Sequence, residues 1–354
     1  MINFLGRLER RVIAVAGGKS GPWERTLTGR LVLSKAAKEL WYSIRDVEEF
    51  APQSLVEGRR LNPWLDVGLR LAYEWRSRLI SYTDINGLLP GGHELVRAGM
   101  VEIFNAIRCA CEGKAFRAAV NNHKRGAKKN YHSCANYMLS MFHDHARPLV
   151  LRVDLYFEGD GRDLSESKKA KNAFNKFMRA LREGRVVPDV LRYIAKREDG
   201  LERRIHYHVL VAMNGDMHCD AFYFSELIGK FWVDQCVGSP SLASYFNVWI
   251  RRHELEYCCL GHLHYRDEHK LEGLRRAIWY LCEDGAYVLV HEVHGRNLRK
   301  GQLPKGERRH KRGRPRRDGA SLALAEGILL APVPAAGERL ALPQQLIRFD
   351  GDCR

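Results

Sequence analysis

Residues 198–215 read EDGLERRIHYHVLVAMNG, and this stretch decides the fold that we expect for the chain. Within it, bulky apolar residues alternate with a second set that contains both histidines, and this period of two predicts a β-strand over residues 204–213. Because successive side chains of a strand point to opposite faces, His206 and His208 share one face. Two imidazoles so placed can bind a divalent metal ion, provided that a carboxylate completes the site.

Two other segments repeat the same histidine spacing, in a chain that contains 15 histidines. Residues 143–145 read HDH and lack an apolar run of their own, whereas residues 262–264 read HLH and form a stronger rival. The spacing alone is common, so a structural role without a metal is the alternative for every pair. We favour His206 and His208 because their strand has a regular apolar face.

The carboxylate of the site depends on the register of the hairpin before the histidines. Glu198 and Glu202 are both close in sequence. If Glu198 pairs with Arg204 across a five-residue loop, it lies on the histidine face. If Asp199 and Gly200 form a tight turn, Glu198 pairs with Leu201 and faces away. The metal hypothesis therefore predicts the longer loop, and surface salt bridges are the alternative for both acids.

The composition favours a polyanionic partner. Lys and Arg number 58 against 42 Asp and Glu, so the net charge is +16, and nucleic acid is the simplest partner. The nine cysteines have no framework or zinc-site spacing, which predicts reduced thiols and a cytoplasmic protein. No stretch approaches the length of a membrane span. The AGGKS at residues 16–20 lacks the first glycine of a phosphate loop, which excludes a nucleotide site there.

The elements around the central strand predict an α+β fold, with a central antiparallel sheet flanked by helices. The expected strands cover residues 148–157, 188–196 and 204–213, with shorter candidates at 245–250 and 257–265. The expected helices cover residues 130–142, 165–183 and 270–283, and one more begins after Asp220. The basic HKRGAKK at residues 123–129 reads as a linker or a phosphate-facing loop.

We expect three parts along the chain. Residues 1–130 are mostly helical with no assigned role, residues 131–295 hold the sheet, and residues 296–354 form a basic, disordered tail. The tail contains KRGRPRR at 311–317, which resembles an AT-hook, a segment that lies in the minor groove of A·T-rich DNA. Its arginines Arg312, Arg314 and Arg316 are candidate DNA contacts. Attraction to phosphates or a plain solvated tail are the alternatives.

A candidate nucleophile lies on the helix predicted over residues 270–283. Tyr280 falls about 130° from the centre of the apolar stripe of that helix, so its own helix does not require it in the core. Arg276, one turn earlier, shares its side. A tyrosine presented to a metal-bound phosphate can act as a covalent nucleophile. Three other tyrosines are alternatives: Tyr257, Tyr265 and Tyr287.

Three segments together resemble the HUH endonucleases, and most closely the inovirus gene-two-type replication initiators with their prophage relatives. The segments are RVDLYF at 152–157, IAKREDGLERRIHYHVLVAMNGD at 194–216, and IWYLCEDGAY at 278–287. The resemblance implies Glu198, His206 and His208 as ligands of Mg²⁺ or Mn²⁺, and Tyr280 as the nicking tyrosine. Where the family has a lysine three residues after this tyrosine, the chain has Glu283, and Arg276 could substitute.

The resemblance also implies an activity and a setting. The chain would nick single-stranded or hairpin DNA, keep a 5′-phosphotyrosyl link and prime rolling-circle replication in the cytoplasm of a bacterial host, beside the host replication machinery. A non-catalytic DNA-binding regulator, or a decayed initiator of the same fold, is the alternative that Glu283 favours. A transposase or relaxase with the same chemistry is a third hypothesis.

Overall fold

The computed structural model describes ten segments of the chain: 2–19, 21–29, 31–53, 60–80, 92–159, 164–199, 205–282, 288–289, 297–303 and 322–332. The chain divides into two compact units. The first contains residues 1–126 and 285–293, and the second contains residues 127–284 and 294–354. Within the described segments, no helix is long and apolar enough to cross a membrane.

The first unit is built mainly from helices, as expected for the N-terminal region. They are α1 (Ile2–Ala16), α2 (Lys35–Arg45), α3 (Val47–Phe50), α5 (Pro63–Ile80), α6 (Gly92–Glu112) and the first part of α7 (Lys114–Leu139). Two short antiparallel pairs accompany them: β1 (Trp23–Arg25) with β2 (Leu31–Leu33), and β3 (Arg60–Leu61) with β9 (Val288–Leu289). Ser34 caps α2, because its side chain accepts a hydrogen bond from the amide of Ala37 at 3.2 Å.

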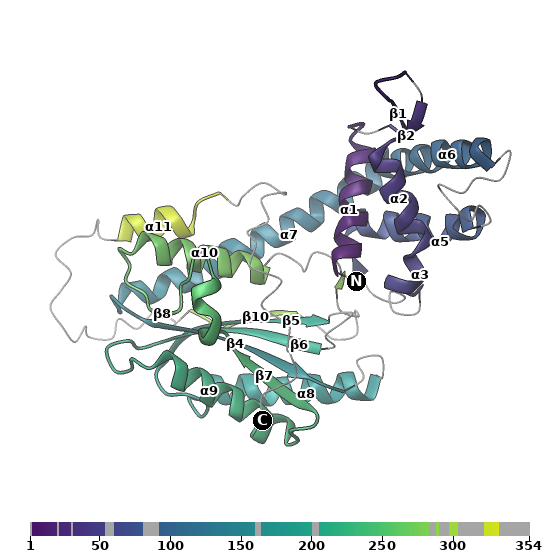
Figure 1. The fold of residues 1–354 in the computed structure, drawn as a ribbon. Coiled ribbons are helices and arrows are strands. Elements are labelled where there is room, and N and C mark those ends of the chain that lie inside the picture. The colour runs from purple at the N-terminus through teal and green to yellow at the C-terminus, as the bar shows by residue number, and fades with distance from the viewer. Residues whose placement is uncertain are drawn as a thin grey trace. The chain divides into compact units, whose positions relative to one another are not determined.

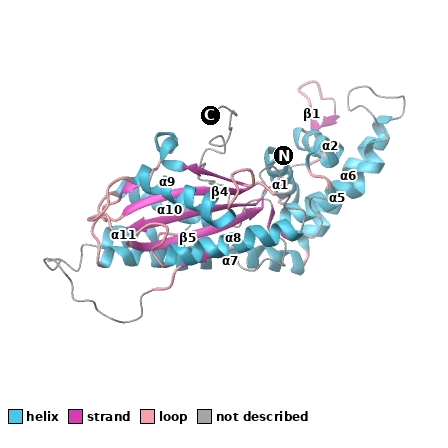
Figure 2. Cartoon of the chain, turned by 90° about the horizontal axis from the view of Figure 1, so that it is seen from below, coloured by secondary structure: helices cyan, strands magenta, loops and turns pink. Residues whose placement is uncertain are grey.

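The second unit is an antiparallel sheet between two layers of helices, which confirms the α+β class (Figure 1). Its strands are β4 (Leu149–Phe157), β5 (Val190–Asp199), β6 (Ile205–Met213), β7 (Ala243–Asn247), β8 (Gly261–His262) and β10 (Leu298–Lys300). They follow the order β10-β5-β6-β4-β7, and β8 pairs with one end of β4. Figure 2 shows these strands side by side among the helices.

One face of the sheet packs on α8 (Leu164–Arg182) and α9 (Ala221–Phe231). The alternating residues of the central strands lie here, as their period of two predicts. The ring of Phe174 stacks on that of Tyr207 with centroids 3.8 Å apart, and the indole of Trp232 donates to the carbonyl of Tyr156 at 2.9 Å. The result is a continuous apolar core that holds β4 and β6 rigidly in place.

The opposite face packs on the second half of α7 and on α10 (Glu268–Cys282), and α11 (Ala323–Leu329) packs in turn on α10. Val150, Ile194, Leu210 and Ala212 supply the apolar contacts from the sheet. On this face, each of the three central strands has apolar residues at one end and polar residues at the other. The polar residues come at the end of β4 and β5 and at the start of β6, because β6 is antiparallel to both. This arrangement creates a polar area at one end of the sheet, beside α10.

Three expectations for local structure were wrong. Residues 123–129 belong to helix α7, because their small and long-chain residues are compatible with a helix despite the lack of an apolar stripe. The strand expected at 245–250 ends at Asn247, whose side chain caps the 3₁₀ helix Val248–Glu254. In the segment 257–265, only Gly261–His262 is a strand, because most of its apolar residues contact α10 rather than a neighbouring strand.

Candidate metal centre and tyrosine

Seven polar side chains gather on the sheet face that α10 covers. They are Arg152, Asp154 and Tyr156 of β4, Lys196 and Glu198 of β5, and His206 and His208 of β6. In the register of the sheet, His208 lies opposite both Asp154 and Lys196, and His206 lies opposite both Tyr156 and Glu198. Directly opposed residues point to the same side of a sheet. The pairing of three strands therefore concentrates these groups in one place.

Glu198, His206 and His208 form a possible metal-binding group, in which one ligand atom of each lies within 4.8 Å of the others. The Glu198 Oε2 atom is 3.4 Å from the Nε2 atoms of both His206 and His208. It is the one group of this kind in the described part of the chain. Two imidazoles and one carboxylate on one side of a cation leave its other positions open for water or substrate. The donor set fits a divalent transition metal such as Mn²⁺ better than Mg²⁺, which prefers oxygen ligands alone.

The hairpin that holds these ligands differs in register from the expectation. Glu198 pairs directly with His206, and Asp199 pairs with Ile205, so the register is shifted by two residues from the expected pairing of Glu198 with Arg204. A shift of two keeps every side chain on its original face, because the side-chain period of a strand is two. Glu198 therefore stays beside the histidines. Glu202 lies outside the described residues.

The orientation of His208 is fixed from β4. Its Nδ1 atom is 2.7 Å from Asp154 Oδ1, and the guanidinium of Arg152 lies 3.3 Å from the same carboxylate oxygen through Nε. A carboxylate on the second ring nitrogen commonly orients a metal-binding histidine and raises its basicity. Sequence reasoning missed Asp154 and Arg152 as site residues. Their only signal was that they alternate with the apolar residues of the strand.

The charges of the site depend on each other. Burial opposes ionisation of Glu198 and of Asp154, but nearby cations outweigh it and lower both pKa values, Lys196 chiefly for Glu198 and Arg152 chiefly for Asp154. Burial also opposes the imidazolium of His208, yet the carboxylates of Asp154 and Glu198 raise its pKa. Both carboxylates are therefore ionised, and Glu198 can act as an anionic ligand to a cation.

Tyr280 reaches this group from α10. Its hydroxyl oxygen is 3.0 Å from His208 Nε2, and the two rings meet edge to face with centroids 5.2 Å apart. The guanidinium of Arg152 lies 5.1 Å from the centre of the Tyr280 ring. Burial, followed by the charge of Glu198, raises the pKa of Tyr280 well above its usual value, so the free protein holds a protonated phenol.

Lys196 is a buried cation at the centre of the site, and sequence reasoning also missed it. Its side chain is only 4% exposed, and its Nζ atom is 3.0 Å from Glu198 Oε1. The same atom lies 5.8 Å from the centre of the Tyr280 ring and 3.4 Å from the Tyr280 carbonyl oxygen. The cationic groups of Arg152 and Lys196 therefore both lie close to the Tyr280 ring, beside the possible metal ligands.

The other residues named from the sequence lie elsewhere or are not described. Arg276 binds Glu272 at 2.9 Å and Glu256 at 3.2 Å, and its guanidinium lies 3.7 Å from the ring centre of Tyr257. The arginine that lies against Tyr280 is Arg152 instead. His262 and His264 join no metal-binding group within the described residues. The residues outside the described part are Glu283, Tyr287, Arg312, Arg314 and Arg316.

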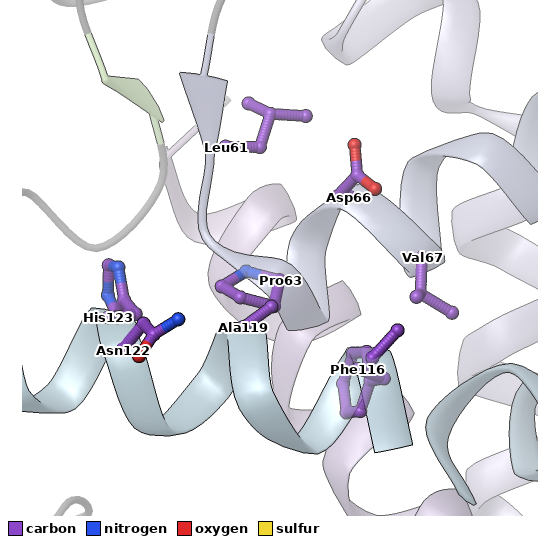
Figure 3. A pocket seen from close by; sticks show the side chains of 9 residues that line it. Leu61, Pro63, Asp66, Val67, Phe116, Ala119, Asn122 and His123 are labelled. Atoms are coloured by element: carbon purple, nitrogen blue, oxygen red, sulfur yellow. The ribbon is translucent and has the colours of Figure 1, made fainter. Parts of the chain in front are cut away.

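A separate pocket of about 490 Å³ lies in the first unit (Figure 3). Leu61 lines it from the end of β3, Pro63 and Asp66 line it from the start of α5, and Phe116 and His123 line it from α7. None of the site residues expected from the sequence lines this pocket.

Comparison with known proteins gives one result. No curated protein and no solved structure matches the chain. Residues 114–273 match the family model of the YagK/YfjJ C-terminal domain, a prophage-associated family of unclear function. The match includes Asp154, Glu198, His206 and His208, and it ends before Tyr280.

Proposed function

We propose that the chain is a metal-assisted DNA-nicking enzyme, a replication initiator of the rolling-circle type. The observation that carries this proposal is the 3.0 Å contact between the Tyr280 hydroxyl and His208 Nε2, next to the Glu198 and His206 side chains. A tyrosine nucleophile beside a possible site for a divalent cation is an arrangement suited to tyrosine-mediated phosphoryl transfer. The match to a prophage-associated family is compatible with this role.

The reaction exchanges one phosphate ester for another. The Tyr280 oxygen forms a bond to the phosphorus of the scissile phosphate, the bond from phosphorus to the 3′ oxygen breaks, and the phenolic proton passes to solvent. The departing oxygen takes up a proton and becomes a free 3′-hydroxyl, and the 5′ phosphate stays on Tyr280. This hydroxyl then primes replication, or it attacks the tyrosyl ester and restores the strand.

The residues around Tyr280 have distinct tasks in this reaction. Glu198, His206 and His208 would hold a divalent cation, which supplies Lewis-acid polarisation of the phosphate when it is bound. Asp154 orients the His208 ring through Nδ1. Arg152 and Lys196 favour an anionic group beside the Tyr280 ring. These charges are preorganised, so they stabilise the negative charge that develops during transfer.

The test of the proposal is the formation of a covalent adduct. Purified protein is incubated with 3′-end-labelled single-stranded and hairpin DNA and Mn²⁺, so that the label stays on the fragment bound to Tyr280, and the mixture is separated on a denaturing protein gel. We expect a labelled protein band that Tyr280→Phe and the chelator EDTA each abolish. Tyr156→Phe is the matched control, because Tyr156 is the other tyrosine of the site and stacks on His206 with ring centroids 5.9 Å apart.

A band that persists in Tyr280→Phe and disappears in Tyr156→Phe would move the nucleophile to β4. The absence of a band with every DNA, for a protein that still binds DNA, would favour the second candidate function, a DNA-binding regulator without catalysis. The raised pKa of Tyr280, which keeps the phenol protonated, is the observation that favours this second function.

A further inference from the structure

Helix α7 carries a row of positive charge that has no part in the proposed reaction. The chain has no Asp or Glu from Gly113 to His143. The first sixteen residues of α7, from Lys114 to Lys129, contain six cations, all exposed: Lys114, Arg117, Lys124, Arg125, Lys128 and Lys129. None of the six forms an ion pair with a described acidic residue, and the polar partner of Arg125 is Asn122 at 2.6 Å.

The six cations lie on one side of the helix. At about 100° per residue, Arg117, Lys124 and Lys128 fall within an arc of about 40°, and all six fall within about 140°. The buried residues Val120 and Ala127 lie outside this arc. Along the axis, the row extends over about 22 Å, because a helix rises about 1.5 Å per residue. The sequence therefore builds an exposed row of positive charge along one side of the helix, without ion pairs to the acidic residues that the structure describes.

We propose that this face of α7 binds the sugar-phosphate backbone of double-stranded DNA. A duplex carries about one phosphate per 1.7 Å of its axis, so about 22 Å of duplex offers more phosphates than the row has cations. A duplex is also a stiff rod, which suits a row of fixed charges on a rigid helix. The row has no aromatic side chain for stacking bases, a feature that favours duplex over single-stranded DNA.

Helix α8 provides a contrast. It also carries exposed cations, but Lys169 pairs with Glu166 at 2.7 Å and Lys176 is bound to the carbonyl oxygen of Gln235. It also packs on the sheet face that faces away from the Tyr280 site. The two helices therefore offer a matched comparison, in which an equal number of exposed charges is removed from each.

The experiment compares two variants of the full chain. The first replaces Lys124, Arg125, Lys128 and Lys129 with Gln, and the control replaces Lys168, Lys169, Arg179 and Arg182 with Gln. Gln has nearly the helix propensity of Lys and Arg, so both variants should keep their helices, which circular dichroism checks. Binding to a fluorescent duplex of random sequence is measured by anisotropy at a series of salt concentrations.

For the α7 variant we expect the affinity to fall by at least about tenfold, and the slope of log affinity against log salt to fall by about 0.9 for each lost contact. The α8 control should bind nearly as the parent chain does. Equal losses in both variants, or an unchanged slope in the α7 variant, would overturn the proposal. A loss of binding to single-stranded DNA alone would overturn the choice of duplex. His206→Ala with His208→Ala should leave duplex binding intact, so this result does not depend on whether the chain nicks DNA.

Discussion

At the scale of single residues, the site depends on the balance between two buried cations and two carboxylates. Lys196 and Glu198 form an ion pair at 3.0 Å, and Arg152 and Asp154 form a second one at 3.3 Å. A buried charge is costly without a partner, so each group constrains the position of the other. The same pairs surround Tyr280, which links the packing of the site to the proposed chemistry.

Lys196→Met should change two properties in opposite directions. Affinity for Mn²⁺ should rise by about tenfold, because Glu198 loses a competing cation. The rate of adduct formation should fall by about 100-fold, mainly in kcat, because a preorganised positive charge is lost next to the phosphate. Calorimetric titration with Mn²⁺ and single-turnover cleavage measure the two effects.

Lys196→Arg is the control for charge, and it should restore Mn²⁺ affinity to near the parent value. If Lys196→Met weakens Mn²⁺ binding as well as cleavage, then Lys196 has a structural role and the prediction is wrong.

At the scale of elements, close packing of α10 positions Tyr280. A Cβ atom on Gly273 would lie 2.8 Å from the backbone nitrogen of Cys259 and 2.9 Å from the carbonyl carbon of Cys258. Glycine therefore allows α10 to pack directly against the chain before β8. Gly126 of α7 is different, because a Cβ atom there meets nothing within 4 Å.

Gly273→Ala and Gly126→Ala should therefore have opposite effects on stability. We expect Gly273→Ala to destabilise the fold by about 1–3 kcal/mol and to slow adduct formation, since α10 must move. Gly126→Ala should stabilise the fold by about 0.5–1 kcal/mol through helix propensity alone. Thermal unfolding checks both changes, and a neutral Gly273→Ala would show that α10 has room to adjust.

The sequence predicts elements well where periodicity is strong. The strands β4, β5 and β6 and the helices α8 and α10 lie close to their expected ranges, because each has a regular apolar pattern. The pairing of β10 with β5 could not be expected, because Leu298–Lys300 is too short to show a period. The middle of α7 was not predicted as a helix because its residues form no apolar stripe, and an exposed helix does not need one.

The site also contains residues that a local pattern predicts and residues that it does not. Glu198, His206 and His208 could be named from the sequence because one hairpin brings them together locally. Asp154 and Arg152 join them through the pairing of β4 with β6, a contact between segments distant in sequence. Lys196 belongs to the same hairpin, but its contact with Tyr280 depends on the packing of α10. Their roles depend on a register that no local pattern reveals.

At the scale of the whole molecule, the proposed ligands all belong to the second of the two compact units. A ligand that binds only the folded state stabilises it, by about 2.7 kcal/mol at a concentration 100 times its dissociation constant. Mn²⁺ should therefore slow amide hydrogen exchange in β4, β5 and β6, and leave α1, α2 and α5 unchanged. Exchange monitored by mass spectrometry measures this difference.

The variant with both His206→Ala and His208→Ala is the control, and it should show no change with Mn²⁺ in either unit. Slower exchange in α1 or α5 of the parent chain would place the cation elsewhere and contradict the assignment.

The contact between Tyr280 and His208 has one more consequence. His208 Nδ1 is bound to Asp154, so Nε2 is the ring atom left for every other partner. One nitrogen cannot serve a phenol and a cation at once. His208 Nε2 therefore holds the Tyr280 hydroxyl in this structure, and a cation that takes this nitrogen would release the tyrosine. Under the proposed function, this hydrogen bond would keep the Tyr280 hydroxyl occupied until a cation is bound.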